Sequence, residues 1–298
     1  MVLDSLDRPE QGEEGMSEHQ FSIGSIECRV ISAGRAAYPT EQMFAGVPDD
    51  QLAPALEGRL DANGNVPTNY SCLLVRSGGR IALIETGLGD TAREWGLPEE
   101  DLQEALQQAG VSSGDVDLVV ISHAHPDHIG GLTSAQDGER APAFGETPVY
   151  FWRDEWEFWT SEEGLAQVPG LVAGPARTHL PVLGEADVVE AVDEEMDVLP
   201  GVRLIPAPGH TPGHMAVALT SGGEGALYMG DAAMHELHLE HPDWLTVFDA
   251  IPALTVQSRR KLIEQAVREN RLVVVYHMFT PGWMRKSDGA YMFEPAEE

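Results

Sequence analysis

Short apolar runs rich in Val, Ile and Leu recur along the chain from Phe21 onward, separated by Gly, Pro and polar residues. Runs of this composition are typical of β-strands, and the continuous ones are expected to be buried on both faces. The sequence Ser77-Gly78-Gly79 predicts a hairpin turn between two of them. The predicted strands are residues 21–32, 71–75, 80–85, 117–121, 148–152, 188–192, 202–206, 215–219, 226–229 and 272–276.

Helices are predicted between these strands. Residues 98–109 carry apolar side chains at helical spacing behind an N-terminal Pro and two acids, and residues 153–160 and 252–270 are two further candidates. No repeat of fixed period is present in the sequence. Short strands with helices inserted between them predict the α/β class, as a sandwich of two sheets faced by helices rather than a barrel.

The chain is predicted to consist of a tail and one domain. Residues 1–18 are expected to be a flexible acidic tail, and residues 19–298 a single domain. Within it, residues 38–68 contain Pro, Gly and Asn and lack a clear apolar pattern. Loops of this length in a compact domain commonly act as lids or contact arms, so a lid or contact loop is expected here.

Acidic residues far outnumber basic ones. The 298 residues include 49 Asp+Glu and 18 Lys+Arg, which gives a formal net charge of −31. This charge repels phosphate backbones and anionic lipid, so nucleic acid and membrane are excluded as partners. No apolar run approaches the roughly 18 residues of a membrane span. The first residues also lack the features of a signal peptide. We therefore expect a cytoplasmic protein.

The acidic excess suits a protein that remains soluble at high salt, where self-repulsion is screened. Lysine is scarce, with only Lys261 and Lys286, although a coding bias toward Arg explains this equally well. Adaptation to salt is a hypothesis, and a melting temperature that fails to rise between low and molar salt would contradict it. Cys28 and Cys72 lie in strand-like surroundings and are predicted to be buried free thiols.

The candidate chemistry begins directly after the apolar run 117–121. His123 and His125 are two residues apart in extended chain and therefore point the same way. Pro126 suits the first position of a helix, which would turn Asp127 and His128 back toward them. Four residues able to bind a metal, lying this close together at a strand end, predict a metal site.

Further ligand types follow three later strands. His210 and His214 come after the strand 202–206, Asp231 after 226–229, and His277 after 272–276. Each lies where an apolar strand meets a loop, so these side chains are expected to converge at one edge of a sheet.

Together these motifs, HxHxDH, GHTPGH, GD and a late His, resemble the metallo-β-lactamase-fold hydrolase superfamily over about residues 70–277. The resemblance implies a four-layer αββα sandwich with two metal ions between the sheets. It also implies that His123, His125 and His210 hold one ion, Asp127, His128 and His277 hold the other, and Asp231 bridges both.

Imidazole and carboxylate ligands without thiolate suit Zn²⁺, with Mn²⁺, Fe²⁺ and Co²⁺ as alternatives. Two such ions can share a hydroxide, which would attack a carbonyl or phosphoryl centre. By the same resemblance, Asp127 would orient the nucleophile and pass a proton to the leaving group.

The sequence departs from the resemblance at two positions. Glu85 stands where the superfamily commonly has Asp, and Met234 stands where lactonases of this kind often have a Tyr that polarises the carbonyl. His235 is the candidate to replace that Tyr as a catalytic residue. His238 and His241 follow at intervals of three, but no carboxylates complete a metal shell, so an irregular turn is expected. His214 is predicted to support the ligands rather than bind metal, and His179 to lie at the surface.

The resulting prediction is a two-metal hydrolase, a lactonase or esterase of quorum-quenching type, acting on a small-molecule ester or lactone. An organophosphate triesterase or arylesterase is the alternative. A β-lactamase is disfavoured because no Lys lies near the motifs to hold a substrate carboxylate. The contrasting class is a degenerate metal-binding protein without activity. For the oligomeric state, a monomer and a homodimer are both compatible with the sequence.

Overall fold

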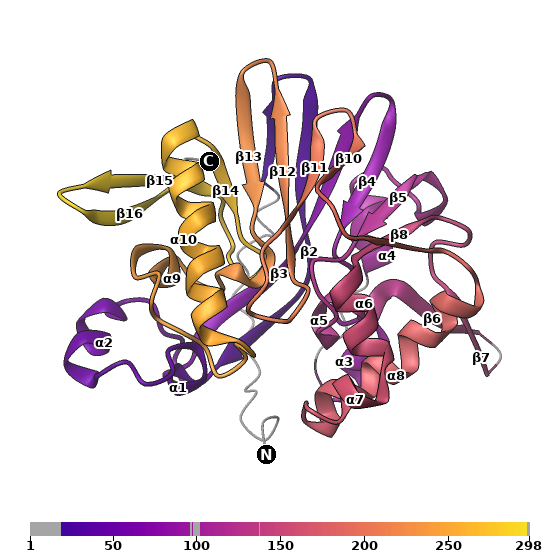
Figure 1. The fold of residues 1–298 in the computed structure, drawn as a ribbon, viewed down its shortest axis with the longest axis horizontal. Helices are drawn as coiled ribbons and strands as arrows, with labels where there is room; N and C mark the ends of the chain where they lie inside the picture. The colour runs from indigo at the N-terminus through magenta and orange to yellow at the C-terminus, as the bar shows by residue number, and fades with distance from the viewer. Residues whose placement is uncertain (1–18, 96, 98–101, 137, 297–298) are drawn as a thin grey trace.

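The computed structural model describes residues 19–95, 97, 102–136 and 138–296, so the tail predicted over 1–18 and the start of the helix predicted over 98–109 lie outside the described residues. Two seven-stranded sheets form the centre of the molecule (Figure 1). The first has the order β1-β2-β3-β4-β5-β8-β9 and the second β10-β11-β12-β13-β14-β15-β16. The mixed α/β class with two sheets is confirmed.

The strands of the first sheet are β1 (Gln20–Ile23), β2 (Ile26–Tyr38), β3 (Val66–Ser77), β4 (Arg80–Ile84), β5 (Leu118–Val120), β8 (Val149–Trp152) and β9 (Val189–Val192). Those of the second are β10 (Met196–Leu199), β11 (Val202–Pro206), β12 (Met215–Ser221), β13 (Glu224–Tyr228), β14 (Leu272–Val274), β15 (Gly282–Ser287) and β16 (Ala290–Pro295). A separate hairpin consists of β6 (Thr133–Gln136) and β7 (Glu139–Pro142).

Helices cover the outer faces of the sheets. The helix α10 (Pro252–Glu269) packs Leu262 and Ile263 on the second sheet, while α6 (Arg153–Thr160) and α8 (Gly170–Glu185) bury Trp159 and Leu183 on the side of the first. Shorter helices are α1 (Thr40–Met43), α2 (Asp49–Ala55), α3 (Asp90–Glu94), α4 (Leu102–Gln108), α5 (Pro126–Ile129), α7 (Glu162–Leu165) and α9 (Glu236–Glu240). Among the described residues, none of the helices is both long and apolar enough to span a lipid bilayer.

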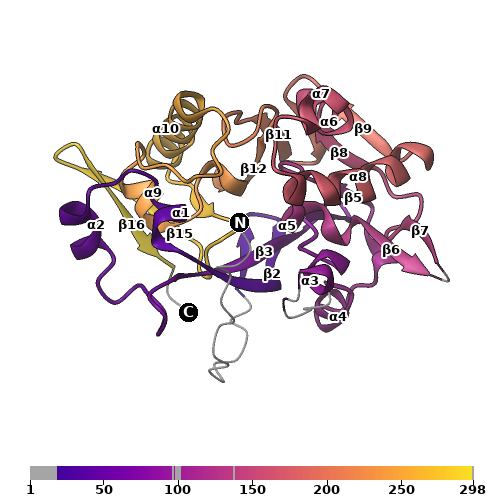
Figure 2. The same ribbon diagram turned by 90° about the horizontal axis from the view of Figure 1, so that it is seen from below.

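The main hydrophobic core includes residues of both sheets and of the helices that cover the first sheet, and it contains both cysteines as buried free thiols, as predicted. The strand β5 is fully buried, which explains the continuous apolar run in its sequence. Because β4, β5 and β8 run parallel, as do β13 and β14, the loops that follow them emerge at the same end of the sandwich. Figure 2 looks onto this end, with α1 and α2 on one side and α3 to α8 on the other.

Residues 38–68 are more ordered than the predicted loop. They contain α1, α2 and the ends of the long strands β2 and β3. Met43, Phe44 and Leu52 pack in a small core of their own with Leu237 and Trp244. This part of the chain therefore packs against the segment around α9.

Candidate metal centre

The first group of predicted ligands lies on the loop between β5 and α5. His125 precedes α5, and Pro126 occupies its first turn, as predicted. This turn brings His128 back so that its ring packs on that of His123, with 3.9 Å between the ring centroids. Both side chains are completely buried.

Glu85, which follows β4, supports this loop. Its Oε2 lies 3.2 Å from His128 Nδ1, and its Oε1 accepts a hydrogen bond from the Ser122 N–H at 3.2 Å. Glu85 has a φ of +67°, an uncommon conformation for a residue other than glycine. Although the Glu85 side chain is one methylene longer than the expected Asp, its carboxylate contacts the loop that carries His128.

The later ligands arrive on three other strand ends. His210 donates from Nδ1 to Asp249 Oδ1 at 3.1 Å, which leaves its Nε2 for a metal. His214 Nε2 accepts from the Asp231 N–H at 3.0 Å, so it supports the ligands as predicted. Gly230, with a φ of +50°, makes room for this contact, because a Cβ there would lie 2.7 Å from His214 Nε2.

The seven predicted ligands form one cluster centred on Asp231. Its Oδ2 lies 3.1 Å from His277 Nε2 and 3.5 Å from His210 Nε2, and its Oδ1 lies 3.5 Å from His128 Nε2. The Asp127 carboxylate reaches the same space, with Oδ2 3.4 Å from His277 Nε2. Within 4.8 Å, ligand atoms form three groups: His123, His125 and His210; His123, His128 and Asp231; and Asp127, His128 and His277.

These residues fit a pair of divalent cations. His123 Nε2, His128 Nε2 and Asp231 Oδ1 are buried without a hydrogen-bond partner, which is costly unless a cation satisfies them. Burial lowers the pKa values of His123 and His125 well below the usual value, so both imidazoles are in the neutral form that binds a metal. Burial opposes the ionised form of Asp231, but His277 and His128 hold its pKa well below the usual range.

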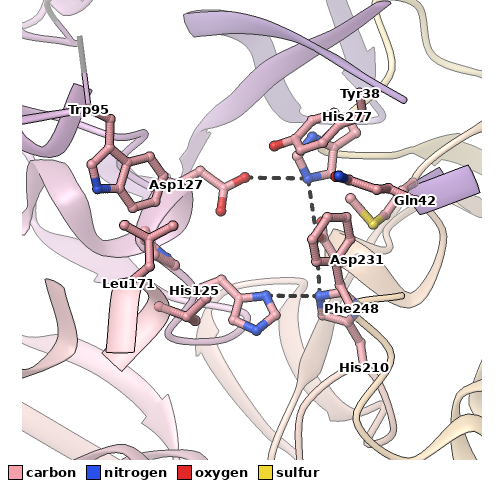
Figure 3. A pocket seen from close by; sticks show the side chains of 13 residues that line it. Tyr38, Gln42, Trp95, His125, Asp127, Leu171, His210, Asp231, Phe248 and His277 are labelled. Atoms are coloured by element: carbon pink, nitrogen blue, oxygen red, sulfur yellow. Dashed lines mark hydrogen bonds and ion pairs between the residues drawn. The ribbon is translucent and has the colours of Figure 1, made fainter. Parts of the chain in front are cut away.

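A cavity opens beside this cluster and has an empty volume of about 600 Å³, part of it open to solvent. Figure 3 shows His125, Asp127, His210, Asp231 and His277 facing one another at its base. The remaining lining is largely apolar and consists of Tyr38, Gln42, Trp95, Pro126, Leu171, Val172, Met234 and Phe248.

His235 does not line this cavity among the described residues. Its Nδ1 accepts a hydrogen bond from the Leu237 N–H at 3.1 Å and so caps α9, and its ring packs on Phe44. This placement gives no support to the catalytic role predicted for it. The irregular turn expected over residues 235–241 contains the helix α9, in which His238 Nε2 bonds the Met43 carbonyl at 2.8 Å.

The prediction of a surface position for His179 is wrong. This residue is buried on α8, and its Nδ1 lies 2.7 Å from Thr133 Oγ1. The sequence hides this role because α8 contains Pro175 and Pro181, which obscure its helical pattern.

Two buried carboxylates that no sequence motif singles out hold the ligand loops. Glu155 on α6 accepts from the Ala124 N–H at 2.8 Å and the Gly213 N–H at 2.9 Å, and so ties the loop of His125 to that of His210. Asp249 orients His210 directly. Both lie far in sequence from the histidines whose loops they hold.

Replacing Asp249 by asparagine is expected to weaken metal binding by about 10- to 100-fold. The carboxylate accepts from His210 through Oδ1 and from the Thr246 N–H through Oδ2, at 2.8 Å, whereas an amide offers one acceptor oxygen. Competition with a chromophoric chelator measures the affinity, and Asp243→Asn, an exposed carboxylate nearby, is the control. An unchanged affinity in the Asp249 variant would contradict its positioning role.

Sequence comparison links the chain to one protein family and to curated relatives. The family model described as the metallo-beta-lactamase superfamily matches residues 65–277. An N-acyl homoserine lactonase from a Bacillus species is 29% identical over 184 residues, 61% of the chain and 64% of that protein. A "probable metallo-hydrolase" of Mycobacterium tuberculosis is 28% identical over 190 residues, 55% of the chain and 56% of that protein. The chain matches less than two thirds of the length of these relatives.

Solved structures share the fold. A hydrolase of the β-lactamase superfamily, AbOPH, superposes with a TM-score of 0.84 at 22% identity, covering 96% of this chain and 99% of that one. AidC, a dizinc quorum-quenching lactonase in complex with a product, superposes with a TM-score of 0.78 at 23% identity, covering 94% and 98%.

Proposed function

The chain belongs to the metallo-β-lactamase superfamily, and we propose that it is a two-metal hydrolase that opens lactone or ester bonds of small molecules. One observation carries the proposal. The buried Asp231 carboxylate lies between histidines from separate loops, with buried ligand atoms left unpartnered, at the base of an apolar cavity.

In this proposal His123, His125 and His210 hold one ion, Asp127, His128 and His277 hold the second, and Asp231 is shared. When bound, two divalent ions supply Lewis acidity and an activated water. Zn²⁺ is the proposed metal because the donors are imidazole and carboxylate.

Asp127 is the proposed proton carrier. Its carboxylate is 14% exposed, whereas the side chains of His128, His277 and Asp231 are at most 2% exposed, and it lines the cavity where a substrate would lie. The Tyr276 hydroxyl donates to the Asp127 backbone carbonyl and fixes this residue in place. We propose that Asp127 receives the proton of the nucleophile and delivers it to the leaving alkoxide.

The cavity lining favours an uncharged substrate. Among the described residues that line it, neither Lys nor Arg is present, so no permanent cation is available to bind a substrate carboxylate. This argues against a β-lactam, which carries such a group. Apolar side chains such as Leu171, Val172 and Phe248 suit a neutral ester or lactone with an apolar substituent. The likeness to lactonases agrees with this choice.

A substrate panel on the Zn²⁺-loaded protein tests the proposal. We expect ring opening of N-hexanoyl-homoserine lactone, followed by pH-stat, that is lost on chelation and restored by Zn²⁺. Faster turnover of paraoxon than of the lactone would instead indicate an organophosphate triesterase. Zinc content near zero, with no turnover of any lactone, ester or phosphotriester, would instead support the contrasting class, a degenerate metal-binding protein without activity.

We also propose that residues 38–68 serve as a lid or contact loop in a single domain. We propose further that the protein works in the cytoplasm as a monomer or homodimer, and that its acidic charge reflects a high-salt setting. Size exclusion of the intact protein and melting curves in low and molar salt test the last two of these.

A further inference from the structure

Tyr38 lies at the meeting point of the cavity and the candidate metal centre. It ends β2 and lines the cavity. Its ring meets those of His277 and Phe248 edge-on, with centroid distances of 6.1 and 5.8 Å. In Figure 3 the Tyr38 side chain lies beside His277, on the side of the cavity that Asp127 and Asp231 also face.

The Tyr38 hydroxyl is paired with a second, deeper hydroxyl. The two oxygens of Tyr38 and Tyr70 lie 3.2 Å apart, and either could donate. Tyr70 is only 2% exposed and its ring stacks on Tyr276 at 5.7 Å, whereas Tyr38 is partly buried at the cavity. Gly34 makes room for Tyr70, because a Cβ there would lie 2.7 Å from Tyr70 Cδ2.

Counting protons gives the direction of this hydrogen bond. Two hydroxyls carry two protons, and their mutual bond uses one. If Tyr38 donated to Tyr70, the second proton would remain on the buried Tyr70 hydroxyl. Among the described residues, this hydroxyl has no hydrogen-bond partner other than Tyr38. An unsatisfied buried donor costs about 1–3 kcal/mol. Donation from Tyr70 to Tyr38 avoids this cost and leaves the Tyr38 O–H to point into the cavity.

Few other uncharged donors line this cavity. The Met234 thioether has no proton to donate. Trp95 directs its indole nitrogen away from the ligand cluster in Figure 3. Among the described lining residues other than the proposed metal ligands, Gln42 is the remaining uncharged donor, and it serves below as the rival candidate.

On the basis of the proposed function, we infer that the Tyr38 hydroxyl, oriented by Tyr70, donates a hydrogen bond to the carbonyl oxygen of the substrate. As the nucleophile adds to the carbonyl carbon, the C=O π pair moves onto this oxygen and the hydrogen bond strengthens. When the C–O bond to the leaving alkoxide breaks, the C=O bond forms again and the hydrogen bond weakens. Tyr38 keeps its proton throughout, and the leaving group takes its proton from Asp127.

Kinetics of single and double variants test this inference on the Zn²⁺-loaded protein. We expect Tyr38→Phe to lower kcat by about 100-fold, as for the loss of one donor to a developing oxyanion, with KM and zinc content nearly unchanged. Tyr70→Phe removes only the orienting group, so its loss is expected to be smaller. The double variant should be no slower than Tyr38→Phe alone, because both act through one hydrogen bond.

A matched control is Tyr228→Phe, which removes another buried tyrosine hydroxyl, one that donates to the Ser71 carbonyl at 3.0 Å away from the cavity lining. It should lower the melting temperature and leave kcat within twofold. If Tyr38→Phe also stays within twofold, or if Gln42→Leu alone causes the large loss, the inference is overturned.

A binding measurement separates this inference from the proposed function. The probe is the γ-lactam analogue of N-hexanoyl-homoserine lactone, labelled with ¹³C at the ring carbonyl, bound to the Zn²⁺-loaded protein. We expect its infrared carbonyl band at lower frequency in the wild type than in Tyr38→Phe. If the wild type hydrolyses nothing but this difference persists, the activity is wrong and the Tyr38 contact stands. Absence of any difference overturns the contact, even where turnover is found.

Discussion

Replacing Asp231 by asparagine is expected to lower kcat/KM for a lactone by at least about a thousandfold, equivalent to about 4 kcal/mol of transition-state stabilisation. Among the residues that the structure describes, Asp231 is the carboxylate that lies within 3.5 Å of ligand nitrogens from both proposed groups, His210 on one side and His128 and His277 on the other. The amide is neutral and has a single acceptor oxygen, so it cannot balance two divalent ions. Initial rates together with metal analysis by mass spectrometry measure the effect.

The control for this variant is Asp197→Asn, which removes a carboxylate that is half exposed on β10 and pairs with Arg203. It should keep two ions and full activity, because an exposed ion pair contributes little. An Asp231 variant that retains both ions and more than a tenth of the wild-type kcat/KM would refute the shared-ligand arrangement.

The ligand cluster was predictable because its signals are local. His123, Asp231 and His277 each follow a short apolar run, and a buried strand delivers the next residue to the sheet edge wherever the strand lies in the fold. Pro126 likewise predicts the start of α5, because the fixed φ angle of proline suits the first turn of a helix. Such features need no knowledge of distant contacts.

The supporting residues were not predictable for the opposite reason. Glu155, Asp249 and Tyr38 have ordinary neighbours in sequence, and each makes its key contact with a residue more than thirty positions away. The catalytic role predicted for His235 depends on its closeness in sequence to Asp231, whereas in the fold its ring packs on Phe44. The strands β15 and β16 do not stand out in the sequence as apolar runs rich in Val, Ile and Leu, and they are held by pairing, β15 with β14 and β16 with β15.

Replacing Glu155 by alanine is expected to destabilise the fold by at least about 3 kcal/mol. The buried carboxylate accepts four hydrogen bonds: from the Ala124 N–H, the Gly213 N–H, Thr211 Oγ1 at 2.7 Å and Trp159 Nε1 at 2.6 Å. Alanine leaves these donors without their acceptor and opens a cavity beneath both histidine loops. A fall in melting temperature of roughly 6 °C or more should follow for a chain of this size, measured by circular dichroism on the metal-free protein.

Metal binding distinguishes this effect from a general loss of helix stability. Glu157→Ala is the matched control, because Glu157 lies on the same helix two residues away but is exposed. It should change the melting temperature by about 1–2 °C at most, since exposed substitutions stay within about 0.5 kcal/mol. Glu155→Ala should in addition bind zinc more weakly, because the loops that carry His125 and His210 are no longer tied together. If its zinc affinity equals that of Glu157→Ala, Glu155 supports the core of the protein but does not position the ligands.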